Sequence, residues 1–150
     1  MSERDLVTMG RMKEIVVVLT GGILLLLSAW HFYWVAGGTW GKAVAVPQQG
    51  ERPLLRPSVA ATLAVAILLA AAAAIVVSKL KTWEDPTINQ LTRWGNLALA
   101  SVFGLRALGD IRWVGFFKRV RGTPFANLDT WVYSPLCVFL SLGCLYTARG

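Results

Sequence analysis

Two long stretches without a charged residue constrain the fold of this chain more than any other feature. They cover residues 15–36 and 59–78, and neither contains Asp, Glu, Lys or Arg. The first stretch, with about 22 residues at a rise of 1.5 Å each, forms a helix of about 33 Å, which is long enough to cross the hydrocarbon core of a bilayer. The sequence therefore predicts an integral membrane protein.

A cleavable signal peptide is the alternative explanation for the first stretch. Signal peptides have an apolar region of about 7–15 residues that is followed by small residues at the cleavage site. This stretch is longer, and the bulky Trp30, Phe32, Tyr33 and Trp34 stand where small residues would be needed. We therefore expect it to remain as a membrane helix.

Four helices are predicted within a single domain that covers residues 1–150. Asp85 and Pro86 form a typical helix start, Asp129 is expected to cap the last helix, and Pro135 is expected to bend it. Four crossings would place both termini on the same side. The expected fold is an all-α integral membrane four-helix bundle, with helices at about 15–36, 58–79, 86–108 and 129–148.

The net charge of +7 does not indicate nucleic-acid binding in a chain of this kind. The Lys and Arg residues lie in the tails and between the apolar stretches, where they contact lipid headgroups. No nucleic-acid motif is present, so the expected partners are membrane lipids. The orientation stays open, because the expected loops and tails of the two sides carry equal numbers of Lys and Arg.

Polar and ionisable residues gather at one predicted end of the bundle. Charged groups at membrane depth are costly unless they pair or line a cavity, so they indicate a functional site by default. Arg106 and Asp110 are four residues apart, so on a helix they would share a face and could pair. The predicted site is a polar pocket near one membrane surface, lined by His31, Tyr33, Trp34, Arg106, Asp110, Lys118, Asp129, Tyr133 and Ser134.

A structural interpretation of the same residues stays open. The charged groups would then lie at the membrane interface and hold the helix ends together. For His31 we favour a hydrogen bond to a neighbouring helix over a catalytic or metal role, and Cys137 fits a small apolar filler. One histidine and two cysteines do not form a zinc site, so we expect neither a metal nor a cofactor. An aromatic belt is the simplest interpretation of Trp30, Trp34, Trp40, Trp113 and Trp131.

Three ordered motifs carry a family resemblance. They are His31-Phe32-Tyr33-Trp34 with Gly37-Gly38, Trp40-Gly41 and Val46-Pro47; Arg106-Ala107-Leu108-Gly109-Asp110 with Gly115-Phe116-Phe117-Lys118; and Phe125-Ala126 with Asp129 and Tyr133-Ser134-Pro135-Leu136-Cys137. From about Leu19 to Tyr146 the chain resembles an uncharacterised family of small, mainly bacterial membrane proteins, domain of unknown function 3995. The resemblance implies a four-helix, multi-pass protein of the cell membrane, the inner membrane in a bacterium. It implies no activity.

The leading functional hypothesis is binding of a small amphipathic molecule, such as a lipid, an isoprenoid or a quinone. Arg106 would contact an anionic head, while His31 and Tyr33 would donate hydrogen bonds or move a proton. The alternative is an accessory subunit of a membrane complex, or a homo-oligomer, that packs through Ala- and Gly-rich faces.

Two further functions are weaker hypotheses. A small exporter would place a carboxylate inside its first helix, whereas Glu14 precedes the apolar stretch. A membrane enzyme would need a recognisable set of catalytic groups, and no spacing here specifies a reaction. Whether the protein is an enzyme therefore stays open.

Overall fold

Helices account for almost all of the regular structure. The computed structural model describes residues 2–49, 52–54, 57–81, 83, 85–110 and 112–149. Within these ranges, the long helices are α1 (Glu3–Val35), α2 (Val59–Val77) and α3 (Pro86–Leu108), followed by a final helix in three consecutive parts, α4 (Pro124–Leu128), the π-helical turn η3 (Asp129–Tyr133) and α5 (Ser134–Arg149). The short elements are η1 (Lys42–Val44), η2 (Ser78–Leu80) and the antiparallel strands β1 (Gln48–Gln49) and β2 (Arg52–Pro53).

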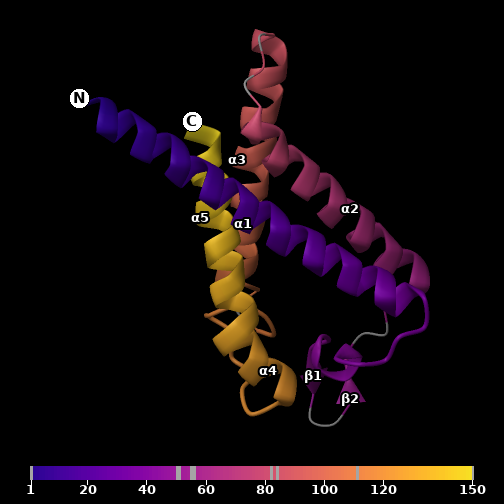
Figure 1. Ribbon diagram of the computed structural model, residues 1–150. Coiled ribbons are helices and arrows are strands. Elements are labelled where there is room, and N and C mark those ends of the chain that lie inside the picture. The colour runs from indigo at the N-terminus through magenta and orange to yellow at the C-terminus, as the bar shows by residue number, and fades with distance from the viewer. Residues whose placement is uncertain are drawn as a thin grey trace.

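The long helices form two hairpins that cross obliquely. α1 lies along α2 and α3 lies along α5, and the hairpins meet mainly where α1 crosses α5 (Figure 1). The N-terminal end of α1 and the C-terminal end of α5 lie at one end of the molecule, and the described parts of the loops 36–58 and 109–123 lie at the other (Figure 1). The predicted all-α four-helix bundle with both termini on the same side is confirmed.

Small residues bring α1 close to its neighbours. A Cβ added at Gly21 would lie 2.6 Å from Cγ2 of Val77 on α2, and the Ser28 hydroxyl donates to the Ala66 carbonyl at 2.8 Å. Where α1 crosses α5, a Cβ at Gly143 would collide with the side chain of Thr20. Close backbone approach at small residues is the usual packing of helices in lipid.

The pairing of α3 with α5 adds polar contacts to apolar packing. Thr147 donates to Oδ1 of the fully buried Asn96 at 2.8 Å, and Ser141 donates to the carbonyl of Ala100 at 2.7 Å. These bonds satisfy polar side chains that would be costly in lipid. They explain how α3 can be the most polar of the four helices and still pack inside the bundle.

In the part of the chain that the structure describes, three helical stretches are long and apolar enough to cross a membrane. They are Val7–Val35, Val59–Leu80 and Pro124–Arg149. α3, with 23 residues, is also long enough, but its composition is too polar for this set. The predicted class of membrane protein therefore rests on three of the four helices.

Two helix starts differ from the predicted ones. α1 begins at Glu3 instead of about residue 15, so the charged segment before the apolar stretch is also helical. The Asp5 carboxylate accepts the Ser2 N–H at 2.9 Å and stabilises this first turn. The last helix begins at Pro124 instead of Asp129, because Thr123 caps it by accepting the Ala126 N–H at 3.1 Å. Asp129 consequently lies inside the helix and does not cap it.

The turn around Pro135 is wider than an α-helical turn. Pro135 has no N–H to donate. In the preceding turn, η3, the helix adopts i to i−5 bonding, and the Ser134 N–H donates to the Asp129 carbonyl. π-turns of this kind occur frequently at functional sites. The turn contains Asp129, Thr130 and Tyr133, which belong to the site described next.

Candidate functional site

Asp110 lies in the turn that follows α3, and it does not pair with Arg106 as the sequence predicted. α3 ends at Leu108, and Gly109 turns the chain away with a φ of 89°. Oδ1 of Asp110 accepts hydrogen bonds at 3.0, 2.6 and 3.0 Å from the backbone N–H groups of Arg112, Trp113 and Val114. Slight burial opposes ionisation of this carboxyl, but the three N–H groups outweigh it and lower its pKa below the usual value.

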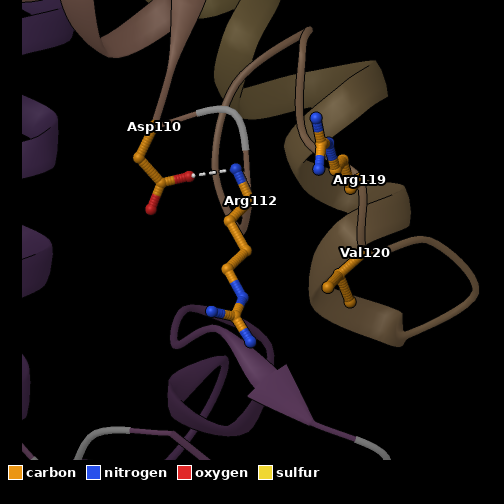
Figure 2. A pocket seen from close by; sticks show the side chains of 4 residues that line it. All are labelled: Asp110, Arg112, Arg119 and Val120. Atoms are coloured by element: carbon orange, nitrogen blue, oxygen red, sulfur yellow. Dashed lines mark hydrogen bonds between the residues drawn. The ribbon is translucent and has the colours of Figure 1, made fainter.

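A hollow of about 500 Å³ opens beside this turn. Asp110 and Arg112 line one side of it, and Arg119 and Val120 line the other (Figure 2). The Val120 N–H donates to the Arg112 carbonyl at 3.1 Å, which ties the two sides together. Neither Arg112 nor Arg119 is among the nine residues that the sequence predicts for the pocket.

Two glycines allow the loop to fold back onto the end of α3. Gly109 and Gly115 have φ angles of 89° and 85°, and their backbones touch, so a Cβ on either one would collide with the facing chain. The Phe116 N–H donates to the Ala107 carbonyl at 2.9 Å and closes the loop. Only glycine combines this backbone conformation with such close approach. The fold-back directs the Gly115 N–H and the Lys118 side chain toward η3.

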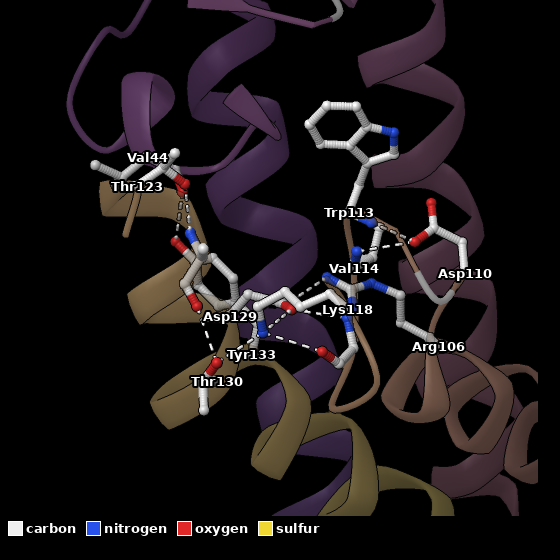
Figure 3. Close-up of polar contacts among 12 residues, drawn as sticks. Val44, Arg106, Asp110, Trp113, Val114, Lys118, Thr123, Asp129, Thr130 and Tyr133 are labelled. Carbon is white, nitrogen blue, oxygen red and sulfur yellow. Dashed lines mark hydrogen bonds and ion pairs between the residues drawn. The ribbon is translucent and has the colours of Figure 1, made fainter. Parts of the chain in front are cut away.

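Asp129 is the centre of the polar cluster formed there (Figure 3). It is fully buried. Its Oδ1 lies 2.8 Å from Nη2 of Arg106, and its Oδ2 accepts the Gly115 N–H at 2.7 Å and lies 3.0 Å from Nζ of Lys118. One carboxylate thus joins the end of α3, the 109–123 loop and the last helix.

The Lys118 ammonium group is fully satisfied. The residue is 4% exposed. Besides Asp129, Nζ contacts the Gly115 carbonyl at 3.0 Å and Oγ1 of Thr130 at 2.7 Å, and that hydroxyl donates in turn to the Ala126 carbonyl. An ammonium group has three N–H donors, and each of them has an acceptor here.

Arg106 is the incompletely paired member of the cluster. Its side chain is 35% exposed and uses Nη2 for the contact with Asp129. Nη1 is buried and has no hydrogen-bond partner among the described residues. Two cations therefore share one carboxylate, and the cluster keeps a net charge of +1.

His31, Tyr33 and Trp34 form a separate aromatic group at the end of α1. Nδ1 of His31 lies 2.7 Å from the Leu27 carbonyl, so the histidine bonds to its own helix and not to a neighbouring one. Trp34 donates to the Trp40 carbonyl at 2.9 Å, and the Tyr33 hydroxyl accepts the Trp40 N–H at 3.4 Å. These bonds fold the chain after α1 back onto the last turn of the helix.

No hydrogen bond, ion pair or ring contact between described residues joins this aromatic group to Asp129. Tyr133 reaches toward the first loop instead and donates to the Val44 carbonyl at 3.3 Å. Ser134 is fully buried, and its hydroxyl has no partner in the described part of the chain. Of the nine predicted pocket residues, the structure gathers Arg106, Lys118 and Asp129 through direct contacts.

Sequence reasoning missed two members of the cluster. Gly115 contributes a backbone N–H, for which the side chain gives no signal, although it belongs to the Gly115-Phe116-Phe117-Lys118 motif. Thr130 carries no charge and looks like an ordinary helix residue. Among the described residues, no group of three or more His, Cys, Asp and Glu side chains could hold a metal ion.

Comparison with known protein families identifies the family of this chain. No curated protein and no solved structure matches the chain. The family model described as "Protein of unknown function (DUF3995)" matches residues 24–144, a range that includes the aromatic group, the hollow and the whole Asp129 cluster. Because the match extends over most of the sequence and follows the three motifs, the chain belongs to the DUF3995 family.

Proposed function

We propose that this membrane protein binds a small amphipathic molecule with an anionic headgroup, a phospholipid or an isoprenoid phosphate, and that the headgroup contacts Arg106. The observation that carries the proposal is the unbalanced charge of the Asp129 cluster. Arg106 and Lys118 share a single buried carboxylate, and Nη1 of Arg106 has no partner among the described residues.

An uncompensated charge at membrane depth is costly, and an anion at Arg106 would remove that cost. The guanidinium group is suited to this task, because its planar set of donors matches phosphate and carboxylate oxygens. Lys118 cannot do the same, since all of its donors are used. A quinone carries no negative charge, so it would leave the imbalance in place.

The surface beside Arg106 suits an apolar chain. Val102, one turn earlier on the same face of α3, is 61% exposed, and Leu105, three residues after Val102, is 68% exposed. A molecule whose head reaches Arg106 would lay its chain along these residues. This combination of a cation and adjacent lipid-facing apolar side chains supports an amphipathic ligand over a small soluble anion.

We also propose that the protein crosses the cell membrane several times. Three helical stretches support it by length and composition. In this arrangement α3 would be the fourth crossing, with Asn96 directed toward Thr147 on α5. Charge at membrane depth can be tolerated in α3 because the last helix supplies its partner, Asp129.

Native mass spectrometry of the protein in mild detergent, combined with lipid analysis, tests the proposal. We expect one bound anionic lipid per chain. Arg106→Lys retains a cation for Asp129 but loses the second guanidinium donor, so the bound lipid should fall about tenfold, as expected for the loss of one charge-assisted contact. Arg121→Lys, the same change at an exposed position of the loop, is the matched control and should retain the lipid.

Equal lipid retention by the folded Arg106→Lys variant would refute the proposal. A protein that co-purifies in place of a lipid would support the accessory-subunit alternative. That alternative has no particular support from the α1–α2 packing, because Gly21 and the buried Ala66 and Ala73 already contact the partner helix within the chain.

A further inference from the structure

A second ligand site is suggested by the hollow beside the 109–123 loop. Neither Arg106 nor Asp129 lines it; its walls are Asp110, Arg112, Arg119 and Val120 (Figure 2). The site is therefore separate from the headgroup contact proposed at Arg106.

Backbone hydrogen bonds hold both walls of the hollow in place. Three consecutive N–H groups fix Oδ1 of Asp110, and the Asp110 N–H donates to the Val114 carbonyl at 3.3 Å. The Val120 N–H binds the Arg112 carbonyl, which holds the opposite wall beside the first. A site with fixed walls loses less entropy when a ligand binds.

The charges in the hollow are of both signs. Arg112 and Arg119 are exposed, and neither forms an ion pair with a described residue. The Arg112 guanidinium lies 5.3 Å from the centroid of the Trp113 ring. Asp110 remains an anion, because its backbone contacts lower its pKa, and its second oxygen, Oδ2, has no hydrogen bond within the described part of the loop.

We propose that this hollow binds a phosphoethanolamine group, with the phosphate at Arg112 and Arg119 and the primary ammonium at Oδ2 of Asp110. Two guanidinium groups satisfy a phosphate diester, and one carboxylate satisfies an ammonium group with N–H donors. A phosphoglycerol group would leave Asp110 without a cation. A phosphocholine group has no N–H to donate to it.

The chain around the hollow points to a lipid as the source of this group. Phe116 and Phe117, which lie between the two walls in sequence, are 42% and 65% exposed. Together with Trp113 they are the aromatic side chains typical of a segment at the membrane interface. A lipid headgroup at this level would have its acyl chains beside exposed phenylalanines.

Native mass spectrometry from micelles with equal amounts of phosphatidylethanolamine, phosphatidylcholine and phosphatidylglycerol of identical chains tests the inference. For the lipid that binds in addition to the anionic lipid proposed at Arg106, we expect the wild-type protein to prefer phosphatidylethanolamine by about tenfold, the value of one charge-assisted hydrogen bond. Asp110→Asn keeps an oxygen for the three N–H groups and should abolish the preference. Arg119→Gln should lower the binding of all three lipids, whereas the exposed Arg121→Gln should not.

Soluble phosphoethanolamine, added as a competitor, distinguishes the two sources of the group. Displacement of the lipid at equal concentration would assign the hollow to a water-soluble phosphoamine, and resistance would assign it to the lipid. An unchanged preference in Asp110→Asn, or equal behaviour of Arg119→Gln and Arg121→Gln, would overturn the inference. Arg106→Lys should leave this preference intact, so failure here is distinguishable from failure at Arg106.

Discussion

Replacement of Asp129 by Asn tests how strongly the buried ion cluster holds the 109–123 loop on the last helix. The Asp129 side chain is fully buried and that of Lys118 is 3% exposed, so water cannot screen their interaction. Asp129→Asn leaves two cations without a carboxylate, and removal of one partner from a buried pair costs about 3–5 kcal/mol of unfolding free energy.

Lys118→Met should be milder, because Asp129 keeps its contact with Arg106. The variant loses the hydrogen bonds of Nζ to the Gly115 carbonyl and to Thr130, so we expect a cost of about 2 kcal/mol at about 1 kcal/mol per bond. If the two sites were independent, the double variant would lose about 5–7 kcal/mol. Because it no longer contains an unpaired buried ammonium group, we expect it to lose about 2–3 kcal/mol less than that sum.

The four proteins of this double-mutant cycle can be compared by reversible unfolding in mixed detergent with increasing sodium dodecyl sulfate, followed by tryptophan fluorescence. The coupling free energy is the difference between the double variant and the sum of the single ones. A coupling below about 0.5 kcal/mol, the usual scatter for independent sites, would refute the view that Asp129 and Lys118 act as one electrostatic unit.

Gly143→Ala should lower the free energy of unfolding by about 1–3 kcal/mol, because the added Cβ collides with Thr20 where the two hairpins cross. Gly22→Ala is the control, since its Cβ would have nothing within 4 Å and should cost nothing. Equal unfolding midpoints of the two variants would contradict this packing. The pKa of Asp110 is lower in the folded chain than in the unfolded chain, where it is about 3.9. Its ionised form therefore stabilises the loop fully at pH values above about 3.9, and this contribution is lost as the pH falls through the pKa of the folded chain. Asp110→Asn should therefore be less stable than the wild type at pH 6, and the difference should shrink as the pH falls below about 3.9. A difference in unfolding midpoint that stayed constant as the pH was lowered would contradict this expectation.

Sequence reasoning identified the charged members of the site but paired them wrongly. Arg106 and Asp110 have the spacing of a helical pair, and that rule holds only if both residues are helical. Gly109 ends α3 between them, and its φ of 89° sends Asp110 into the loop. The helix-ending signal was present in the sequence, because glycine after a helical stretch is a common C-terminal residue. The real partner, Asp129, comes from a different helix, and spacing within one helix cannot indicate it.

The sequence also contains a signal for the start of the last helix. Thr123 followed by Pro124 is a standard N-terminal signature, and it precedes Asp129, the residue that the sequence analysis predicts as the cap. Because the helix starts early, Asp129 lies inside it and its carboxylate is free to bind two cations. Because the sequence prediction starts the last helix at Asp129, it does not show that Asp129 binds Arg106 and Lys118.

The expected gathering of all polar residues in one pocket could not be tested by pattern alone. The order of the helices fixes which ends share a side of the membrane, but it does not fix how far apart those ends lie along it. In the structure the two hairpins cross obliquely, so the C-terminal end of α1 lies away from α4 (Figure 1). The crossing angle depends on side-chain packing around Gly143 and Thr20, which no hydropathy pattern encodes.

The helices of the second hairpin share more polar side-chain contacts than the helices of the first. Apolar surface gives no drive for helix association in lipid, so α1 and α2 depend on close packing at small residues. α3 and the last helix pack through apolar side chains as well, and they add polar contacts from Asn96 near one end to Arg106 near the other. A contact between α3 and the last helix that served only stability would have balanced charges, as the pair of Lys118 and Asp129 has by itself. The additional cation, Arg106, makes this helix contact less stable without a bound anion than with one. For this reason we infer that Arg106 contacts a ligand.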